Sequence, residues 1–183
     1  MGLKTHSKIT LVVRKEDVGI KRYVHLGTGN YNDATAKLYT DMGLLTCNEA
    51  IGEDATAVFN MISGYSEPKQ WNKLSLAPYW LRDRFLYLIR REAMYAKEGR
   101  KAFITAKMNS LCDKEIIAAL YEASSAGVEI NLIVRGICCL KTGIPGISEN
   151  IHVRSIVGTF LEHSRIFYFS NGGNEEVYMA SAD

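Results

Sequence analysis

Two short stretches of the sequence each place an imidazole and a cation two residues apart. His6 and Lys8 stand just before one strand-like run, and His163 and Arg165 stand just before another. In extended backbone, positions i and i+2 point to the same side, so each pair projects together. A neutral imidazole can attack phosphorus, and a neighbouring cation can neutralise phosphoryl oxygens. The spacing therefore indicates phosphoryl chemistry, although one His-x-basic triplet alone is weak evidence.

Both triplets open the same longer pattern. Each is followed by two strand-like runs joined by a polar turn, and then by a small-residue turn that ends in Asn30 or Asp183. The two units lie about 157 residues apart, which predicts duplicated half-sites. If they face each other, one histidine is a nucleophile and the other an acid or base on the leaving oxygen. The turn around Asn30 would add backbone and amide donors to the same anion.

The helices and strands that must position these residues can be predicted from hydrophobic periodicity and from the glycine, proline and polar residues that interrupt it. In the first half we expect strands at 9–13 and 22–26 about a polar turn at 14–21, and short helices at 33–38 and 54–62. A stretch with little periodicity, 63–79, reads as a linker. In the second half we expect a helix at 80–98, with Arg82, Arg84, Arg90 and Arg91 mostly off its apolar stripe. After it we expect strand 102–108, a helix capped by Asp113, strand 129–134, a loop at 136–150, and strands at 150–157, 166–170 and 176–180. The fold class is therefore α/β, with mixed sheets and flanking helices.

Composition excludes several other classes of protein. The 183 residues carry a net charge of +2, and 47% are hydrophobic, so the chain is neither disordered nor strongly basic. Nucleic-acid binding is therefore not expected from charge. No apolar run approaches the ~20 residues that span a bilayer. The four cysteines form no CxxC pair and no apolar signal segment is present, which predicts reduced thiols in a cytoplasmic protein.

The paired triplets resemble the phospholipase D-like superfamily, whose signature is H-x-K-x4-D in two copies. The sequence departs from it, because Val13 and Ser170 occupy the two aspartate positions. That departure argues against an ordinary phosphodiesterase. It is shared by the phospholipase D-like polyphosphate kinases, which the chain resembles nearly throughout. The motifs that carry the resemblance include KTHSK, YVHLGTGNYND, KLYTD, IVRG, FLEHSRIFYF and the final SAD.

The resemblance implies a domain organisation. Residues 1–73 would be the C-terminal part of a first phospholipase D-like domain, and residues 74–183 a nearly complete second one, truncated at its end. The chain would then be a fragment of a longer enzyme, poorly active or inactive alone. The resemblance further implies that the longer protein is a homo-oligomer and associates peripherally with membranes.

The resemblance also implies residue roles. His6 corresponds to the phosphorylated nucleophile, His163 to the second catalytic histidine, and His25 to another histidine on which activity depends. Tyr39 corresponds to the aromatic residue that stacks on adenine, and Arg135 to an arginine at the nucleotide phosphates. From spacing alone, Tyr39 would be a core aromatic, Arg135 a surface charge, and His25 either an orienting or a core imidazole.

The implied reaction moves the terminal phosphate of ATP reversibly to inorganic polyphosphate, leaving ADP, with Mg²⁺ as cofactor. Lys8, Arg165 and Arg135 would offset the charge of the phosphates, and Asn30 would add an amide donor. No residue is assigned as a metal ligand.

Two other functions stay open at this point. A phospholipase D-like phosphodiesterase or nuclease would hydrolyse a diester and form no stable phosphohistidine from ATP. A non-catalytic anion-binding module would bind polyphosphate or nucleic acid through the same basic groups and transfer nothing.

Overall fold

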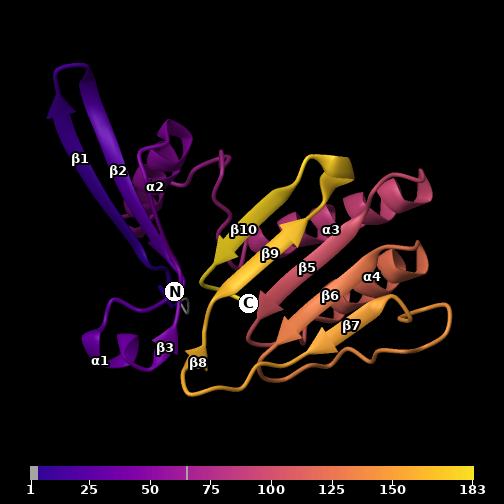
Figure 1. Ribbon diagram of the computed structural model, residues 1–183. Coiled ribbons are helices and arrows are strands. Elements are labelled where there is room, and N and C mark those ends of the chain that lie inside the picture. Colours follow the sequence, from indigo (N-terminus) through magenta and orange to yellow (C-terminus); the bar gives the residue numbers. More distant parts are fainter. Residues whose placement is uncertain (1–3, 65) are drawn as a thin grey trace.

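A computed structural model describes residues 4–64 and 66–183 and confirms the expected α/β class. The N-terminal unit contains a three-stranded antiparallel sheet in the order β1-β2-β4, of which Figure 1 labels the β1–β2 hairpin. Helix α2 packs against β1 and β2. The elements of this unit are β1 (Ile9–Glu16), β2 (Gly19–Gly27), α1 (Asp33–Ala36), β3 (Tyr39–Thr40), β4 (Gly43–Thr46) and α2 (Glu49–Ile62).

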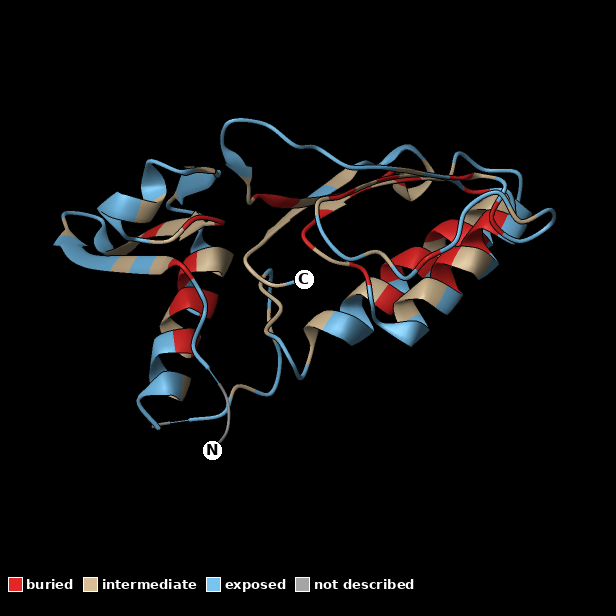
Figure 2. Ribbon diagram, turned by 90° about the horizontal axis from the view of Figure 1, so that it is seen from below, coloured by how far each residue is buried: buried red, intermediate tan, exposed pale blue. Residues whose placement is uncertain are grey.

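The C-terminal unit contains a five-stranded mixed sheet in the order β10-β9-β5-β6-β7. Strands β5, β6 and β7 run parallel, and β9 is antiparallel to both β5 and β10. Helices α3 and α4 cover one face of this sheet (Figures 1 and 2). The elements are α3 (Leu81–Lys97), β5 (Phe103–Met108), α4 (Lys114–Ser125), β6 (Glu129–Val134), β7 (Ile151–Arg154), β8 (Leu161–Glu162), β9 (Arg165–Phe169), a 3₁₀ turn η1 (Asn171–Gly173) and β10 (Glu176–Ala180).

The core lies between that sheet and its two helices, where the buried residues of Figure 2 concentrate. Alternate residues of β5 and β6 face the helices and are almost fully buried, Ile104 and Ile130 among them. The intervening residues, such as Thr105 and Asn131, lie on the other face and stay partly exposed. The period-2 pattern of these strands thus follows from a sheet covered on one face only.

Side-chain caps fix where three helices begin. The side chain of Asn32 accepts from Thr35 N at the start of α1, and Asp113 accepts from Ile116 N at the start of α4. Asn48 caps α2 in the same way, so this helix begins at Glu49 and not at residue 54 as expected. None of the helices in the described ranges is long and apolar enough to cross a membrane.

Two very short strands join the units. β3 of the first unit pairs in parallel with β8 of the second, side by side in Figure 1. Leu161 N donates to Leu38 O at 2.8 Å, and His163 N donates to Thr40 O at 3.1 Å. These bonds connect segments about 120 residues apart and bring residue 163 beside the first unit.

The connection between α2 and α3 is anchored by one buried carboxylate. Asp54 of α2 is 3% exposed and accepts from the backbone N–H groups of Asn72, Lys73 and Leu74 at 2.7–3.0 Å. The described residues of the expected linker at 63–79 form no helix or strand, and residue 65 lies outside the described residues. The contacts with Asp54 fix residues 72–74 near the centre of this linker.

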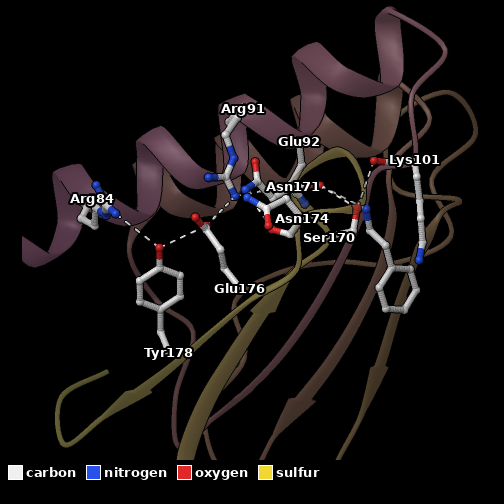
Figure 3. A network of polar contacts seen from close by, with 10 residues as sticks. Arg84, Arg91, Glu92, Lys101, Ser170, Asn171, Asn174, Glu176 and Tyr178 are labelled. Atoms are coloured by element: carbon white, nitrogen blue, oxygen red, sulfur yellow. Dashed lines mark hydrogen bonds and ion pairs between the residues drawn. The ribbon is translucent and has the colours of Figure 1, made fainter. Parts of the chain in front are cut away.

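A second buried carboxylate ties α3 to the turn between β9 and β10 (Figure 3). Glu92 is fully buried and accepts from Asn171 N at 2.9 Å, Ser170 Oγ at 3.2 Å and Phe103 N at 3.3 Å. Arg91 lies between Glu92 and Glu176, with its side chain only 9% exposed. Arg82, Arg84 and Arg90 are exposed, as expected, and Arg91 is the exception, because two carboxylates hold its side chain against the turn.

Several expected boundaries also need correction. Strands β1 and β2 extend to Glu16 and back to Gly19, so the turn expected at 14–21 has only two residues, 17 and 18. Gly19 at φ +118° permits so tight a reversal. The strand expected at 150–157 is shorter, Ile151–Arg154. Strands β3, β4 and β8 were not expected at all.

Candidate active site

His6 and Lys8 precede β1 and form one half of the site. Lys8 Nζ lies 3.0 Å from Nε2 and 3.1 Å from Nδ1 of His6, and it donates to the carbonyl oxygen of His6 at 2.7 Å. Gly27 N donates to Lys8 O, which fixes this segment to the end of β2. Lys8 is only 7% exposed, and burial, followed by the charge of Arg165, lowers the pKa of its ammonium.

The His6 ring reaches across to the second unit. Its Nδ1 lies 3.1 Å from the carbonyl oxygen of Ser181, just after β10. A carbonyl oxygen only accepts, so this contact selects the tautomer with the proton on Nδ1 and the lone pair on Nε2, where Lys8 Nζ lies 3.0 Å away. Burial and then the charge of Lys8 lower the pKa of His6, although the Ser181 contact opposes them. The ring is therefore neutral near pH 7, as a nucleophile must be.

His163 lies between β8 and β9 and stacks against Tyr39 of the first unit. The ring centroids are 4.8 Å apart, and the planes are tilted by 31°. Among the described residues, neither ring nitrogen of His163 has a hydrogen-bond partner. Burial, followed by Arg165 and Arg135, lowers the pKa of His163 to about 4. Lys8 and His6 contribute in the same direction, which places both half-sites within electrostatic reach of one another.

Arg165 begins β9 and is held rigidly at 5% exposure. Its Nε and Nη2 donate to the two carboxylate oxygens of Asp183, both at 3.2 Å, and its Nη1 donates to His163 O at 3.0 Å. Asp183 also accepts from Asn109 N at 2.8 Å. The aspartate at the end of the second repeat thus orients Arg165, a role that sequence reasoning missed. The signal was present, because Asp183 stands where the first repeat has Asn30.

Arg135 follows β6 directly and contributes the third cation. Its Nη1 is buried and has no partner in the described part of the chain. Its backbone is fixed, since Arg135 N donates to Met108 O and Ser155 Oγ donates to Arg135 O. A buried guanidinium N–H without an acceptor is costly, so this arrangement favours an anion at that point.

His25 and Asn30 lie outside this direct cluster. His25 Nδ1 lies 2.6 Å from Tyr31 Oη. A Cβ on Gly27 would fall 3.3 Å from His25 Cε1 and 3.6 Å from Lys8 Cβ, and a Cβ on Gly43 would fall 2.6 Å from His25 Nε2. The structure thus places the His25 ring close to Gly27 and Gly43, at the end of β2 where the Lys8 segment is bonded. Asn30 lies three residues after β2, with no hydrogen bond to either active-site histidine among the described residues.

A cavity opens beside His6 between the two units. It has a volume of about 360 Å³ and is bordered by His6, Lys8 and the end of β10. Its charged lining side chains, as far as the described residues go, are all basic; besides Lys8 they are Lys4, Lys73 and Arg84. The cavity suits a polyanion. Lys107, by contrast, is already paired with Glu162 at 2.7 Å.

The described residues do not form a site for a divalent cation. Nowhere in 4–64 and 66–183 do three or more histidine, cysteine, aspartate or glutamate side chains converge as ligands. Asp183 is already engaged by Arg165, and Glu162, which precedes His163, is engaged by Lys107.

Comparison with known sequence families covers almost the whole chain. The description "Polyphosphate kinase C-terminal domain 2" matches residues 74–183, and "Polyphosphate kinase C-terminal domain 1" matches residues 1–68. This chain belongs to the polyphosphate kinase family. The resemblance on which the sequence reasoning rested is thereby confirmed.

Individual members of the polyphosphate kinase family agree with that assignment. The chain is 65% identical to the polyphosphate kinase of Halalkalibacterium halodurans and 58% identical to that of Synechocystis, aligning over its whole length with 26% and 25% of theirs. It therefore spans about a quarter of these relatives. The crystal structure of the Porphyromonas gingivalis polyphosphate kinase superposes with a TM-score of 0.91 at 44% identity, covering 100% of this chain and 30% of that one.

Proposed function

We propose that this chain is the C-terminal catalytic region of a polyphosphate kinase that transfers the γ-phosphate of ATP reversibly to inorganic polyphosphate through a phosphohistidine. The observation that carries the proposal is the gathering of His6 and His163, one from each unit, among Lys8, Arg165 and Arg135. Two neutral imidazoles among three cations suit the transfer of an anionic group between two anionic carriers.

The first step uses His6 as nucleophile. Its Nε2 lone pair attacks the γ-phosphorus in line, the bond from that phosphorus to the bridging oxygen breaks, and ADP leaves. The Nδ1 proton stays on the ring, held by Ser181 O. Lys8 stands beside the ring and offsets the charge on the transferred phosphoryl oxygens. In the second step a terminal oxygen of polyphosphate takes the phosphoryl group from Nε2, which restores the free imidazole.

His163 exchanges the proton on the leaving oxygen. With a pKa of about 4 in the free protein, it is neutral near pH 7 and has no proton to donate. A bound phosphate chain brings negative charge among Arg165, Arg135 and Lys8, which raises the pKa of His163 toward neutrality. Proton donation thereby depends on bound substrate.

Two further residues bind the nucleotide in this proposal. Arg135, whose buried Nη1 has no acceptor among the described residues, holds the phosphates. Tyr39 has one ring face on His163, and adenine stacks on the other. Asn30 supplies an amide donor to the phosphates in this proposal, and activity depends on His25, which lies beside the Gly27–Lys8 contact.

Mg²⁺ enters with the nucleotide in this proposal. The described side chains supply no ligand set for the ion, and Mg²⁺ is commonly held through substrate phosphates. Its contribution would be to neutralise phosphate charge. ATP, ADP and polyphosphate are accordingly the proposed ligands.

The test is a labelling experiment on the full-length protein that contains this chain, with the isolated chain alongside. Each is incubated with γ-³²P-ATP and Mg²⁺, and protein-bound label is scored for acid lability and base stability. We expect such label on the full-length protein, and a loss of about 10³-fold or more with His6→Ala, because the nucleophile is gone. His152→Ala is the matched control, since His152 is exposed on β7.

The other outcomes separate the competing functions. Label that persists in His6→Ala would place the nucleophile elsewhere. Diester hydrolysis without protein label would favour the phosphodiesterase, and polyphosphate binding that survives His6→Ala without any transfer would favour an anion-binding module.

A further inference from the structure

Two cysteines outside the candidate active site lie within contact distance of each other. The Sγ atoms of Cys112 and Cys139 are 3.7 Å apart, and the Cys139 thiol donates to Cys112. Both residues are exposed, and 27 positions separate them in the chain. The pair has no role in the proposed phosphoryl transfer.

The backbone brings these two thiols into register. Beyond β5 and β6 the chain continues as a pair of parallel segments: Leu111 N donates to Ile137 O and Cys139 N donates to Leu111 O, both at 2.9 Å. Leu111 and Cys138 form a parallel bridge, so the next pair along is Cys112 and Cys139. Neighbouring strands lie about 4.8 Å apart, within the Cα separation of 4.4–6.8 Å that a disulfide spans. Closing the bond therefore requires side-chain rotation and little backbone movement.

The other two cysteines lack this arrangement. Cys138 directs its Sγ toward Leu140 O at 3.7 Å and packs against the hydrophobic core. Cys47 lies in the N-terminal unit, directly after β4. Proximity and exposure together thus single out one pair of the four.

Cys112 also borders an apolar cavity between the sheet and its helices, which has a volume of about 590 Å³. Cys139 is not among the described residues that line this cavity, and both thiols are exposed to solvent. The cavity wall also includes Asp183, the residue that orients Arg165. Cys112 thus shares a cavity with a residue of the candidate active site without being part of that site.

From this geometry we propose that Cys112 and Cys139 are a dithiol–disulfide modification site, oxidised by a low-molecular-weight disulfide. The thiolate of one cysteine attacks a sulfur of the small disulfide, its S–S bond breaks, and one small thiol leaves. The second cysteine then attacks the mixed disulfide, forms the Cys112–Cys139 bond and releases the second small thiol. Two electrons and two protons pass from the cysteines to the small thiols, and an added dithiol reverses the exchange.

The pH dependence of closure follows from the same contact. The close contact with Cys139, followed by burial, raises the pKa of the Cys112 thiol. Because thiolates are the attacking species, the reaction accelerates as pH rises above neutrality.

The test is chemical and does not depend on kinase activity. The reduced full-length protein is exposed to oxidised glutathione, quenched with N-ethylmaleimide and digested with trypsin without reduction. We expect peptides 108–114 and 136–141 to be joined through Cys112 and Cys139, with Cys138 alkylated. The mass is then that of the two reduced peptides plus one N-ethylmaleimide, less two hydrogens, and dithiothreitol separates the peptides. Cys138→Ser should keep the link, whereas Cys139→Ser and Cys112→Ser should each abolish it.

Three results would overturn the proposal. The first is that both cysteines still react with N-ethylmaleimide after exposure to oxidised glutathione. The second is that glutathione adducts form at Cys112 or Cys139 and are never converted into the Cys112–Cys139 disulfide. The third is a link that survives in Cys139→Ser through Cys138. The same protein oxidised in guanidinium is the control for folding, since it should lose the preference for this pair. A result in either direction leaves the phosphohistidine assay unaffected, so the two proposals fail separately.

Discussion

At the scale of single residues, the candidate site is dominated by like charges at close range. Lys8 and Arg165 are both nearly buried, and each lowers the pKa of His163. Among residues 4–64 and 66–183, Asp183 is the carboxylate that balances them directly, through its paired contacts with Arg165. Such crowding disfavours further positive charge and favours a bound polyanion. The neutral state of His163 is therefore a property of the free protein that substrate is expected to change.

This state of His163 predicts a specific pH dependence of stability. Its pKa is about 4 in the folded protein and 6.5 in an unfolded chain, so between these values the unfolded state binds more protons. The free energy of unfolding then falls as pH drops from 6.5 to 4. We expect the free energy of unfolding to fall by about 2 kcal/mol less in His163→Gln than in the wild type over this pH range, after allowing for partial solvent screening. Chemical denaturation at a series of pH values measures the difference.

The control for that experiment is His152→Gln, which changes an exposed histidine. It should leave the wild-type pH profile of stability in place. Equal slopes for wild type and His163→Gln between pH 4 and 6.5 would mean that the imidazole is protonated in the folded protein. Saturation with polyphosphate should move the lower pH limit of this stability loss in the wild-type protein toward neutral pH, because the anion raises the pKa of His163.

At the scale of elements, two buried carboxylates hold a linker and a turn in place against helices. Asp54 fixes the connection after α2, and Glu92 fixes the turn between β9 and β10 to α3. Strand β9 begins at Arg165, so the Glu92 contacts at one end help to hold an active-site residue at the other. These carboxylates act as connectors between elements.

We accordingly expect Glu92→Ala to destabilise the fold by about 3–5 kcal/mol. The substitution leaves Arg91 buried without one of its two carboxylate partners and removes the acceptor from Phe103 N and Asn171 N. Urea unfolding measures the change. Glu98→Ala is the matched control: Glu98 pairs with Arg100 at the exposed end of α3, so its loss should cost less than about 1 kcal/mol. Similar values for both variants would contradict the connector role of Glu92.

At the scale of the whole molecule, the elements with a local sequence pattern could be predicted, whereas the strands that form only by pairing with a distant segment could not. The βαβ unit at 102–134 was predictable, because apolar alternation and the Asp113 cap mark each element. The two histidine–cation triplets could also be found in the sequence, because each is a short local pattern that occurs twice. Strands β3 and β8 were not, since each has two residues and exists only through the other. The contact of Tyr39 with His163 follows from that pairing and so escaped prediction as well.

The joining strands therefore decide whether two half-sites become one. Leu161→Pro removes the N–H that donates to Leu38 O, whereas Leu161→Ala keeps it. We expect the proline variant of the full-length protein to lose phosphotransfer by about 10²-fold, because small displacements of reacting groups are costly. The alanine variant should retain most of the activity, and both should keep the core around β5 and β6 intact. Hydrogen exchange at His163 N, which donates to Thr40 O, should rise in the proline variant alone. Unchanged transfer despite faster exchange there would show that β3–β8 pairing is not what aligns His163 with His6.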